Sequence, residues 1–307
     1  MEESTSEKRG IGLFGLIGMV VSSCIGTGVF AITGQLAGVA SPGAVLVGWL
    51  IAGVGFLALA FSLNNLTDKR PDLHGIFSYA DAGWGSMAGF ISGWGYWLSA
   101  WLGNVAFATM MMSTIGYFFP AFLPGNTIPC IIIASLVMWG ITYLVIRGVE
   151  SAAFLNAIVM VCKVTAIAIT LAFAIFLFKA GIITEDFWGN VYNAAVAAGA
   201  YGPEAVGLGD VGTQIINCMV IMMWCFVGIE GASVVSARAA KKSNVGKATV
   251  IGFLCLLAIY VGASVLPYGY MPYTEIAQLD SPALLYVFNA MAPGWGGAFI
   301  SIAIVVS

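Results

Sequence analysis

The sequence predicts an all-α membrane protein, and three observations support this prediction. Hydrophobic residues make up 60% of the 307 positions and charged residues only 8%, whereas a soluble domain carries about 25% charged residues. The apolar residues form long runs, most of which reach the roughly 20 residues that a membrane-spanning helix needs. No run alternates polar and apolar residues as a strand of a membrane barrel would. The runs cover residues 11–37, 43–63, 84–119, 128–146, 152–178, 219–240, 248–267 and 296–307.

The last apolar run is shorter than the others. It covers residues 296–307, and the sequence stops inside it. A helix of this length cannot cross about 30 Å of hydrocarbon. We therefore expect the chain to be truncated within an eighth helix.

The Lys and Arg residues predict the orientation of the chain. With the N-terminus in the cytoplasm, nine cations fall in cytoplasmic loops and only Lys179 falls in an outer loop, together with six acidic residues. This is the asymmetry of the positive-inside rule. Residues 1–10 lack the apolar core of a signal peptide and are expected to form a cytoplasmic tail. The longest polar connection, residues 180–211, is then outside.

Metal, cofactor and nucleic-acid sites are not indicated. The six cysteines form no CxxC pair, and the single histidine, His74, is expected in a cytoplasmic loop. A net charge of −3 leaves no basic surface for nucleic acid. A membrane-embedded enzyme would need clustered His, Asp or Glu residues at membrane depth, and the sequence shows no such cluster.

The run 219–240 has Gly228-Ile229-Glu230-Gly231 at its centre. Glycine costs about 1 kcal/mol relative to alanine inside a helix, and an acidic side chain at membrane depth is more costly still. Broken helices persist at this depth only where protein or a water-filled cavity satisfies the backbone. This stretch is therefore a candidate substrate site, and the alternative is a helix kinked for packing.

The first run has a matching interruption. Gly26 and Gly28 lie in the middle of this run, and hydroxyl groups accompany them at Ser22, Ser23 and Thr27. Paired glycine interruptions at equivalent places in two halves of a chain point to a transporter site. A broken helix offers N–H groups to a carboxylate and carbonyl groups to an ammonium. Two facing breaks thus suit an α-amino acid.

Three motifs resemble the amino acid–polyamine–organocation superfamily, and within it the basic amino acid antiporters. They are SxxIGTGVF in the first run, GYWLSAWLGNVAF from Gly95, and WCFVGIEGASVVSARAAKKSNVGKAT from Trp224. The resemblance implies an inverted repeat of five plus five helices, with discontinuous helices one and six. Residues 11–179 would form the first repeat and residues 212–307 part of the second, with residues 180–211 as the connection between them.

The resemblance also implies which residues bind the substrate. The carbonyl group of Cys24 would accept a hydrogen bond from the substrate's ammonium group. The N–H and hydroxyl groups of Thr27 and Gly28 would donate hydrogen bonds to the substrate's carboxylate. Trp224 and Val227 would supply carbonyl groups of helix six, and the Trp224 ring would close one side. Phe107 departs from the methionine of arginine/agmatine relatives, which weakens a transfer of substrate identity from that branch. The full set of expected binding residues is Ser23, Cys24, Gly26, Thr27, Gly28, Ser99, Ala100, Asn104, Trp224 and Val227.

Two ionisable residues are expected to act in coupling. Glu230 is implicated by the resemblance in the pH response or the helix-six gate, and the alternative is a carboxylate that caps local N–H groups. Lys163 lies inside the run 152–178 and would replace the sodium ion of other superfamily members. The alternative for Lys163 is a structural pairing with a carbonyl group.

The expected function is exchange of amino acids across the bacterial inner membrane, with arginine and ornithine as the pair and no enzyme activity. Lysine/cadaverine exchange, histidine/histamine exchange and proton-coupled amino acid symport stay open, as does a channel. The expected partners are the amino acid substrate and the lipid bilayer. The sequence does not decide the oligomeric state, and a homodimer stays open.

Overall fold

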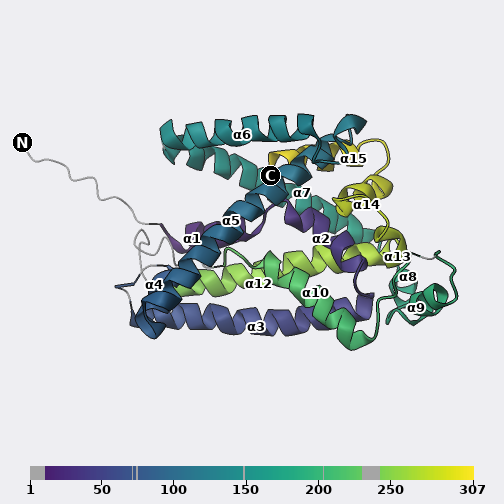
Figure 1. Cartoon of the computed structure of the whole chain (residues 1–307), viewed down its shortest axis with the longest axis horizontal. Coiled ribbons are helices and arrows are strands. Elements are labelled where there is room, and N and C mark those ends of the chain that lie inside the picture. Colours follow the sequence, from purple (N-terminus) through teal and green to yellow (C-terminus); the bar gives the residue numbers. More distant parts are fainter. Residues whose placement is uncertain (1–10, 71, 74, 148, 203, 230–242) are drawn as a thin grey trace, which may run out of the picture. The chain divides into compact units, whose positions relative to one another are not determined.

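The computed structural model describes residues 11–70, 72–73, 75–147, 149–202, 204–229 and 243–307 (Figure 1). The chain divides into two compact units, and each unit is described by itself. Unit 1 consists of Met1–Ile25, Gly53–Ala100 and Phe226–Leu257, and unit 2 consists of Gly26–Ala52, Trp101–Cys225 and Ala258–Ser307.

Five helices within the described residues are long and apolar enough to cross a membrane. Together with the absence of any strand among the described residues, they confirm the prediction of an all-α membrane protein. The five are α3 (Pro42–Lys69), α5 (Ser86–Ile115), α6 (Ile128–Arg147), α7 (Val149–Phe176) and α12 (Ser243–Val265). Each of the five overlaps a predicted run. Helix α3 extends beyond both ends of its run and α5 lies inside its run, while the other three begin and end within about five residues of the predicted ends.

The predicted break in the first helix is confirmed. The helix is split into α1 (Leu13–Cys24) and α2 (Gly28–Ala37), which together count as one broken span. Ile25 leaves the helical conformation, with φ −79° and ψ 98°. Neither piece reaches more than roughly 18 Å, so the span depends on both pieces and on the residues between them.

The sixth helix begins earlier than predicted. It is α10 (Val211–Cys225), whereas the apolar run begins at Met219. Asp210 explains the early start, because its carboxylate accepts from the N–H of Thr213 at 2.8 Å and its carbonyl accepts from the N–H of Gln214 at 3.0 Å. The N–H of Thr213 lowers the pKa of the exposed Asp210 carboxyl group. The helix ends at Cys225, three residues before Gly228.

The connection predicted for residues 180–211 contains two short helices, α8 (Ala180–Thr184) and α9 (Asn190–Ala197). Other short helices also escaped prediction, since each is too brief to give a clear periodic pattern. A surface helix, α4 (Ile76–Trp84), precedes α5, and Gly85 separates the two with φ 88°. The remaining elements are α4 (Ile76–Trp84), η1 (Pro120–Phe122), η3 (Leu266–Gly269), α13 (Tyr273–Ile276), α14 (Ala283–Met291) and α15 (Gly296–Val306).

Unit 2 is packed around α2 and α7. Helix α2 contacts α10, α13 and α14, while α7 lies against α6 and α15 (Figure 1). An aromatic cluster joins α7, α14 and α15, with ring centroids 5.5–6.1 Å apart; its members are Phe173, Phe288, Trp295 and Phe299. Such edge-to-face contacts add to the area they bury.

Two buried hydrogen bonds attach the middle of α2 to neighbouring elements. The Thr33 hydroxyl donates to the carbonyl of Ala263 at 2.7 Å, and the Tyr268 hydroxyl donates to the carbonyl of Thr33 at 3.1 Å. Thr33 and Tyr268 are fully buried. Because buried polar groups lose free energy when they lack a partner, these bonds fix α2 to the end of α12 and to η3.

Unit 1 holds the residues that follow α10 in an aromatic cluster. The Phe226 ring lies between Phe56, with centroids 4.5 Å apart, and Phe253, with centroids 5.1 Å apart. Gly252 of α12 packs against Val20 of α1, and an added Cβ there would lie 2.8 Å from the Val20 side chain. Residues 226–229 are therefore anchored although they are not helical.

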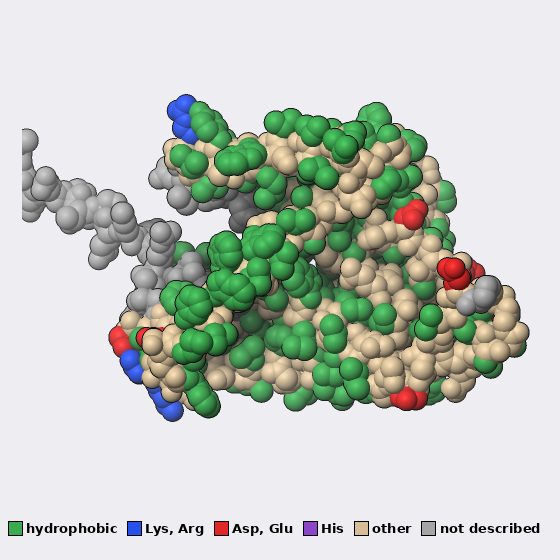
Figure 2. Space-filling view, in the orientation of Figure 1, with side chains coloured by type: hydrophobic (Ala, Val, Ile, Leu, Met, Phe, Trp, Pro, Cys, Tyr) green, Lys and Arg blue, Asp and Glu red, His purple; other side chains and the backbone are tan. Residues whose placement is uncertain are grey.

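The outer face of α6 in unit 2 is apolar, as expected for a surface in contact with lipid. Many of its large apolar side chains are exposed, and hydrophobic side chains gather over α6 in Figure 2. Exposed apolar area of this extent marks a membrane or protein contact. Large exposed side chains on α6 include Ile131, Ile132, Leu136, Trp139 and Ile146.

Gln214 organises the end of unit 2 that carries α8 and α9. Its side chain is 1% exposed and its oxygen accepts from the Ser41 N–H at 2.9 Å and the Ser41 hydroxyl at 2.7 Å. Its Nε2 donates to the carbonyl of Gly209 at 3.1 Å. One amide thus joins the start of α3 to the segment before α10.

Replacing Gln214 with leucine is expected to lower the free energy of unfolding by about 1–3 kcal/mol, because buried Ser41 groups lose their acceptor. Thermal unfolding in detergent, followed by size-exclusion chromatography, measures the loss. The exposed Gln35 provides the matched control, and Gln35→Leu should change the melting temperature little. Equal melting temperatures for both variants would contradict the role assigned to Gln214.

Candidate substrate site

The two predicted breaks touch each other in unit 1. Gly228 adopts φ +109°, a conformation that only glycine adopts readily. A Cβ atom placed on Gly228 would lie 2.8 Å from the carbonyl oxygen of Ser23 and 3.3 Å from the backbone nitrogen of Cys24. The end of α1 and the chain after α10 therefore approach backbone to backbone.

In unit 2 the other side of the first break carries unused donors. The carbonyl groups of Gly26 and Thr27 accept from Val29 and Phe30 at 3.4 Å and 3.1 Å. Within the described part of the chain, no hydrogen bond uses the N–H groups of Gly26, Thr27 or Gly28. These groups lie at the N-terminus of α2, where the helix dipole favours a negative charge.

Thr27 adds a hydroxyl group to these donors. The residue precedes α2, but its helical φ of −61° and ψ of −20° leave its side chain without a capping hydrogen bond. Its Oγ1 is buried and has no partner in the structure, and the residue is 6% exposed. Since leaving a buried polar group unpaired costs free energy, this hydroxyl is available for a further hydrogen bond.

Aromatic rings form the walls next to these donors in unit 2. The Phe107 ring of α5 packs on Gly26, so a Cβ there would lie 3.1 Å from the ring. The Trp224 ring packs on Gly103 of α5, 3.2 Å from the corresponding Cβ position, and its Nε1 lies 4.0 Å from the Cβ position of Gly28. Both glycines thus let a ring approach the backbone closely.

Such an arrangement can bind a small carboxylate between apolar walls. Three N–H groups and one hydroxyl supply donors, and the aromatic rings lower the local polarity, which strengthens these bonds. Groups of His, Cys, Asp and Glu that could hold a metal ion are absent from the described residues.

The other predicted binding residues are distributed over both units. In unit 1, Cys24 is buried and Val227 is 45% exposed, while the Ser23 hydroxyl donates to the carbonyl of Met19 in its own helix at 2.7 Å. The half-buried Ser99 and the exposed Ala100 lie on the part of α5 that belongs to unit 1, and the exposed Asn104 lies on the part that belongs to unit 2.

The two residues predicted to act in coupling have different outcomes. Lys163 lies on α7 and is 4% exposed, and its role in coupling stays a prediction. Glu230 lies outside the described residues, as do His74 and the cations Arg238, Lys241 and Lys242.

Sequence reasoning missed two contacts of α5. Gly103 was not singled out, although it is the surface on which Trp224 rests, and Phe107 was treated only as a departure from a family pattern. The spacing offered a signal, because Gly103 and Phe107 are four residues apart and therefore lie on one face of a helix. Nothing in the sequence alone could place the partners Trp224 and Gly26 on that face.

Comparison with known proteins supports the resemblance. The family profile described as amino acid permease matches residues 11–307. The arginine/ornithine antiporter of Latilactobacillus sakei is 53% identical over 306 residues, which cover 100% of this chain and 62% of that protein. The arginine/ornithine antiporter of Pseudomonas aeruginosa is 42% identical over 308 residues, which cover 100% of this chain and 61% of that protein. The arginine/agmatine antiporter of Chlamydia caviae is 37% identical over 302 residues, which cover 98% of this chain and 60% of that protein. The chain thus spans about 60% of the length of these relatives.

Proposed function

Because this chain belongs to the amino acid permease family of the amino acid–polyamine–organocation superfamily, we propose that it exchanges arginine for ornithine across a membrane. The proposal is supported by relatives that carry the name arginine/ornithine antiporter and are 42–53% identical along the whole chain. Relatives of the arginine/agmatine type are less similar, at 36–38%. Ornithine is therefore preferred over agmatine as the counter-substrate.

The observation that carries the proposal is the set of unused donors at the start of α2. The N–H groups of Gly26, Thr27 and Gly28 and the orphaned Thr27 hydroxyl suit the carboxylate that arginine and ornithine share. The cationic side chain would then extend toward α5.

Exchange follows if the site opens alternately to each side of the membrane and changes sides only when it is occupied. A bound carboxylate satisfies donors that are otherwise unpaired, so the closed state is favoured with substrate present. We propose that the N-terminus faces the cytoplasm and that the membrane is the bacterial inner membrane. Lys163 supplies a buried positive charge in place of sodium, so exchange should proceed without sodium.

The test is counterflow with the full-length protein in liposomes. Radiolabelled arginine outside should enter only when ornithine or arginine is trapped inside, and uptake should saturate. Liposomes loaded with lysine, histidine, agmatine or buffer alone provide the comparison. Uptake that needs no internal amino acid would contradict exchange, and equal uptake in sodium-free and sodium-containing buffer is expected for the role given to Lys163.

A further inference from the structure

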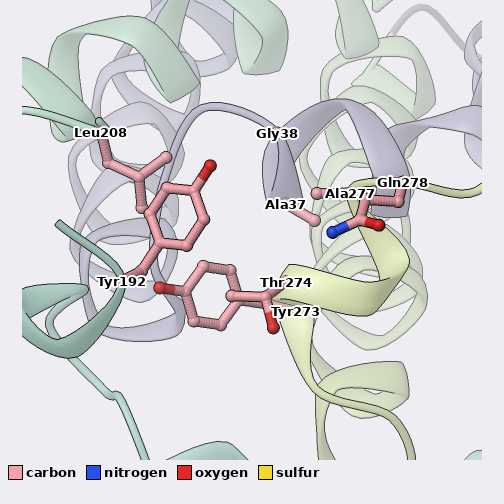
Figure 3. Close-up of a pocket in the computed structure, with 8 residues that line it drawn as sticks. All are labelled: Ala37, Gly38, Tyr192, Leu208, Tyr273, Thr274, Ala277 and Gln278. Carbon is pink, nitrogen blue, oxygen red and sulfur yellow. The ribbon is translucent and has the colours of Figure 1, made fainter. Parts of the chain in front are cut away.

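A second pocket, here called the rim pocket, lies within unit 2 at the C-terminal end of α2. It has a volume of about 170 Å³, and Figure 3 shows its walls. Ala37 and Gly38 come from the end of α2, Tyr192 comes from α9, and Tyr273 and Gln278 come from α13 and the residues after it. None of the residues that line this pocket in the described chain carries a charge.

Two tyrosine rings form one wall of the rim pocket. The rings of Tyr192 and Tyr273 have centroids 6.4 Å apart and an interplanar angle of 64°, and both lie on the same side of the pocket in Figure 3. The face of a tyrosine ring carries an electron-rich π surface. Cations bind to such surface, with guanidinium groups as frequent partners.

Asp186 is hydrogen-bonded to both tyrosines. Its Oδ2 accepts from the Tyr273 hydroxyl at 2.8 Å and from the Tyr192 N–H at 2.9 Å, and its Oδ1 accepts from the Val191 N–H at 3.0 Å. Burial raises the pKa of Tyr273 most, and the hydrogen bond to Asp186 raises it further. A tyrosine phenol is protonated at neutral pH in any case, and this one donates to the Asp186 carboxylate.

The surroundings of the rim pocket favour positive charge. The end of α2 contributes the negative pole of its helix dipole. The segments 179–210 and 270–282 contain six acidic residues and one cation, Lys179, and acidic side chains appear at the α8, α9 and α13 end of unit 2 in Figure 2. A surface of one sign raises the local concentration of ligands of the opposite sign.

We propose that the rim pocket is a second binding site for the guanidinium or ammonium head of a cationic amino acid, which is held there before it enters, or after it leaves, the substrate site. This inference rests on the proposed function. The same helix, α2, borders the substrate site at Gly28 and the rim pocket at Ala37, so the two lie roughly 14 Å apart along its axis. One arginine molecule can therefore occupy each site, and the second site is the weaker because it offers fewer hydrogen bonds.

Equilibrium binding of radiolabelled arginine to the full-length protein in detergent tests this proposal. The wild type should bind two arginine molecules per chain, one of them more weakly. Tyr192→Leu should retain the tighter site and weaken the other by about fivefold or more, since the ring face is lost. Tyr192→Phe keeps the ring and should bind as the wild type does. Gln278→Leu, at an exposed position, provides an independent variant if Tyr192→Leu is unstable.

Each outcome separates the two proposals. Binding of a single arginine by a wild type that still exchanges arginine for ornithine would overturn the rim pocket alone. Two sites that both persist unchanged in Tyr192→Leu and Gln278→Leu would overturn it as well. A wild type that neither binds nor exchanges arginine would remove the proposed function, and the rim pocket with it.

Discussion

Gly228→Ala is expected to reduce exchange by about a hundredfold, because small displacements of binding groups cost this much. The φ of +109° at Gly228 costs a residue with a side chain about 1–3 kcal/mol. The new methyl group would also lie 2.8 Å from the carbonyl oxygen of Ser23. The backbone cannot yield as a flexible side chain would, so the two breaks must move apart. The initial rate of counterflow in liposomes measures the effect.

Gly55→Ala provides the matched control for this substitution. Gly55 lies in α3, in the same unit as Gly228, and no atom lies within 4 Å of its Cβ position. Alanine there should leave exchange intact and stabilise the helix by about 0.5–1 kcal/mol. Exchange by Gly228→Ala at the rate of Gly55→Ala would refute the close contact between the breaks.

Thr27→Val should separate stability from substrate affinity. The valine side chain has nearly the same shape, and the Thr27 Oγ1 has no partner to lose, so the melting temperature should be unchanged or higher. The affinity for arginine should nevertheless fall roughly ten- to hundredfold, since one hydrogen bond to a carboxylate disappears. Binding of radiolabelled arginine and thermal unfolding of the same sample supply both quantities.

Thr170→Val is the corresponding control. The Thr170 hydroxyl is buried but donates to the carbonyl of Ala166 at 2.8 Å in its own helix. Its loss should lower stability slightly and leave the affinity for arginine unchanged. If Thr27→Val binds arginine as tightly as Thr170→Val does, the carboxylate does not lie at the start of α2.

Much of the fold was predictable because lipid demands long apolar helices. The break after Cys24 was also predictable, since two glycines and several hydroxyl groups at the centre of a span leave few alternatives. The start of α10 was not, because Asp210 and the polar Gln214 stabilise a turn that hydropathy does not register. The arrangement of two repeats stays a prediction.

The candidate site was predictable in part. The glycine motifs identified the two breaks, and the resemblance supplied Thr27 and Trp224. The packing of Phe107 on Gly26 and of Trp224 on Gly103 depends on which helices become neighbours in space, and spacing along one helix carries no such information. The rim pocket depends on the small helices α9 and α13, whose lengths of eight and four residues give no clear periodicity.

Two hydrogen bonds, one from Thr33 to Ala263 and one from Tyr268 to Thr33, attach the middle of α2 to the end of α12 and to η3. The donors proposed for the carboxylate lie at the N-terminal end of α2, and the rim pocket lies at its C-terminal end. Both hydrogen bonds are made at Thr33, between these two ends. If substrate binding displaces the first turn of α2, we expect these two bonds to transmit the displacement to the last turn of α12 and to η3. A change at the start of α2 would thereby reach a neighbouring helix.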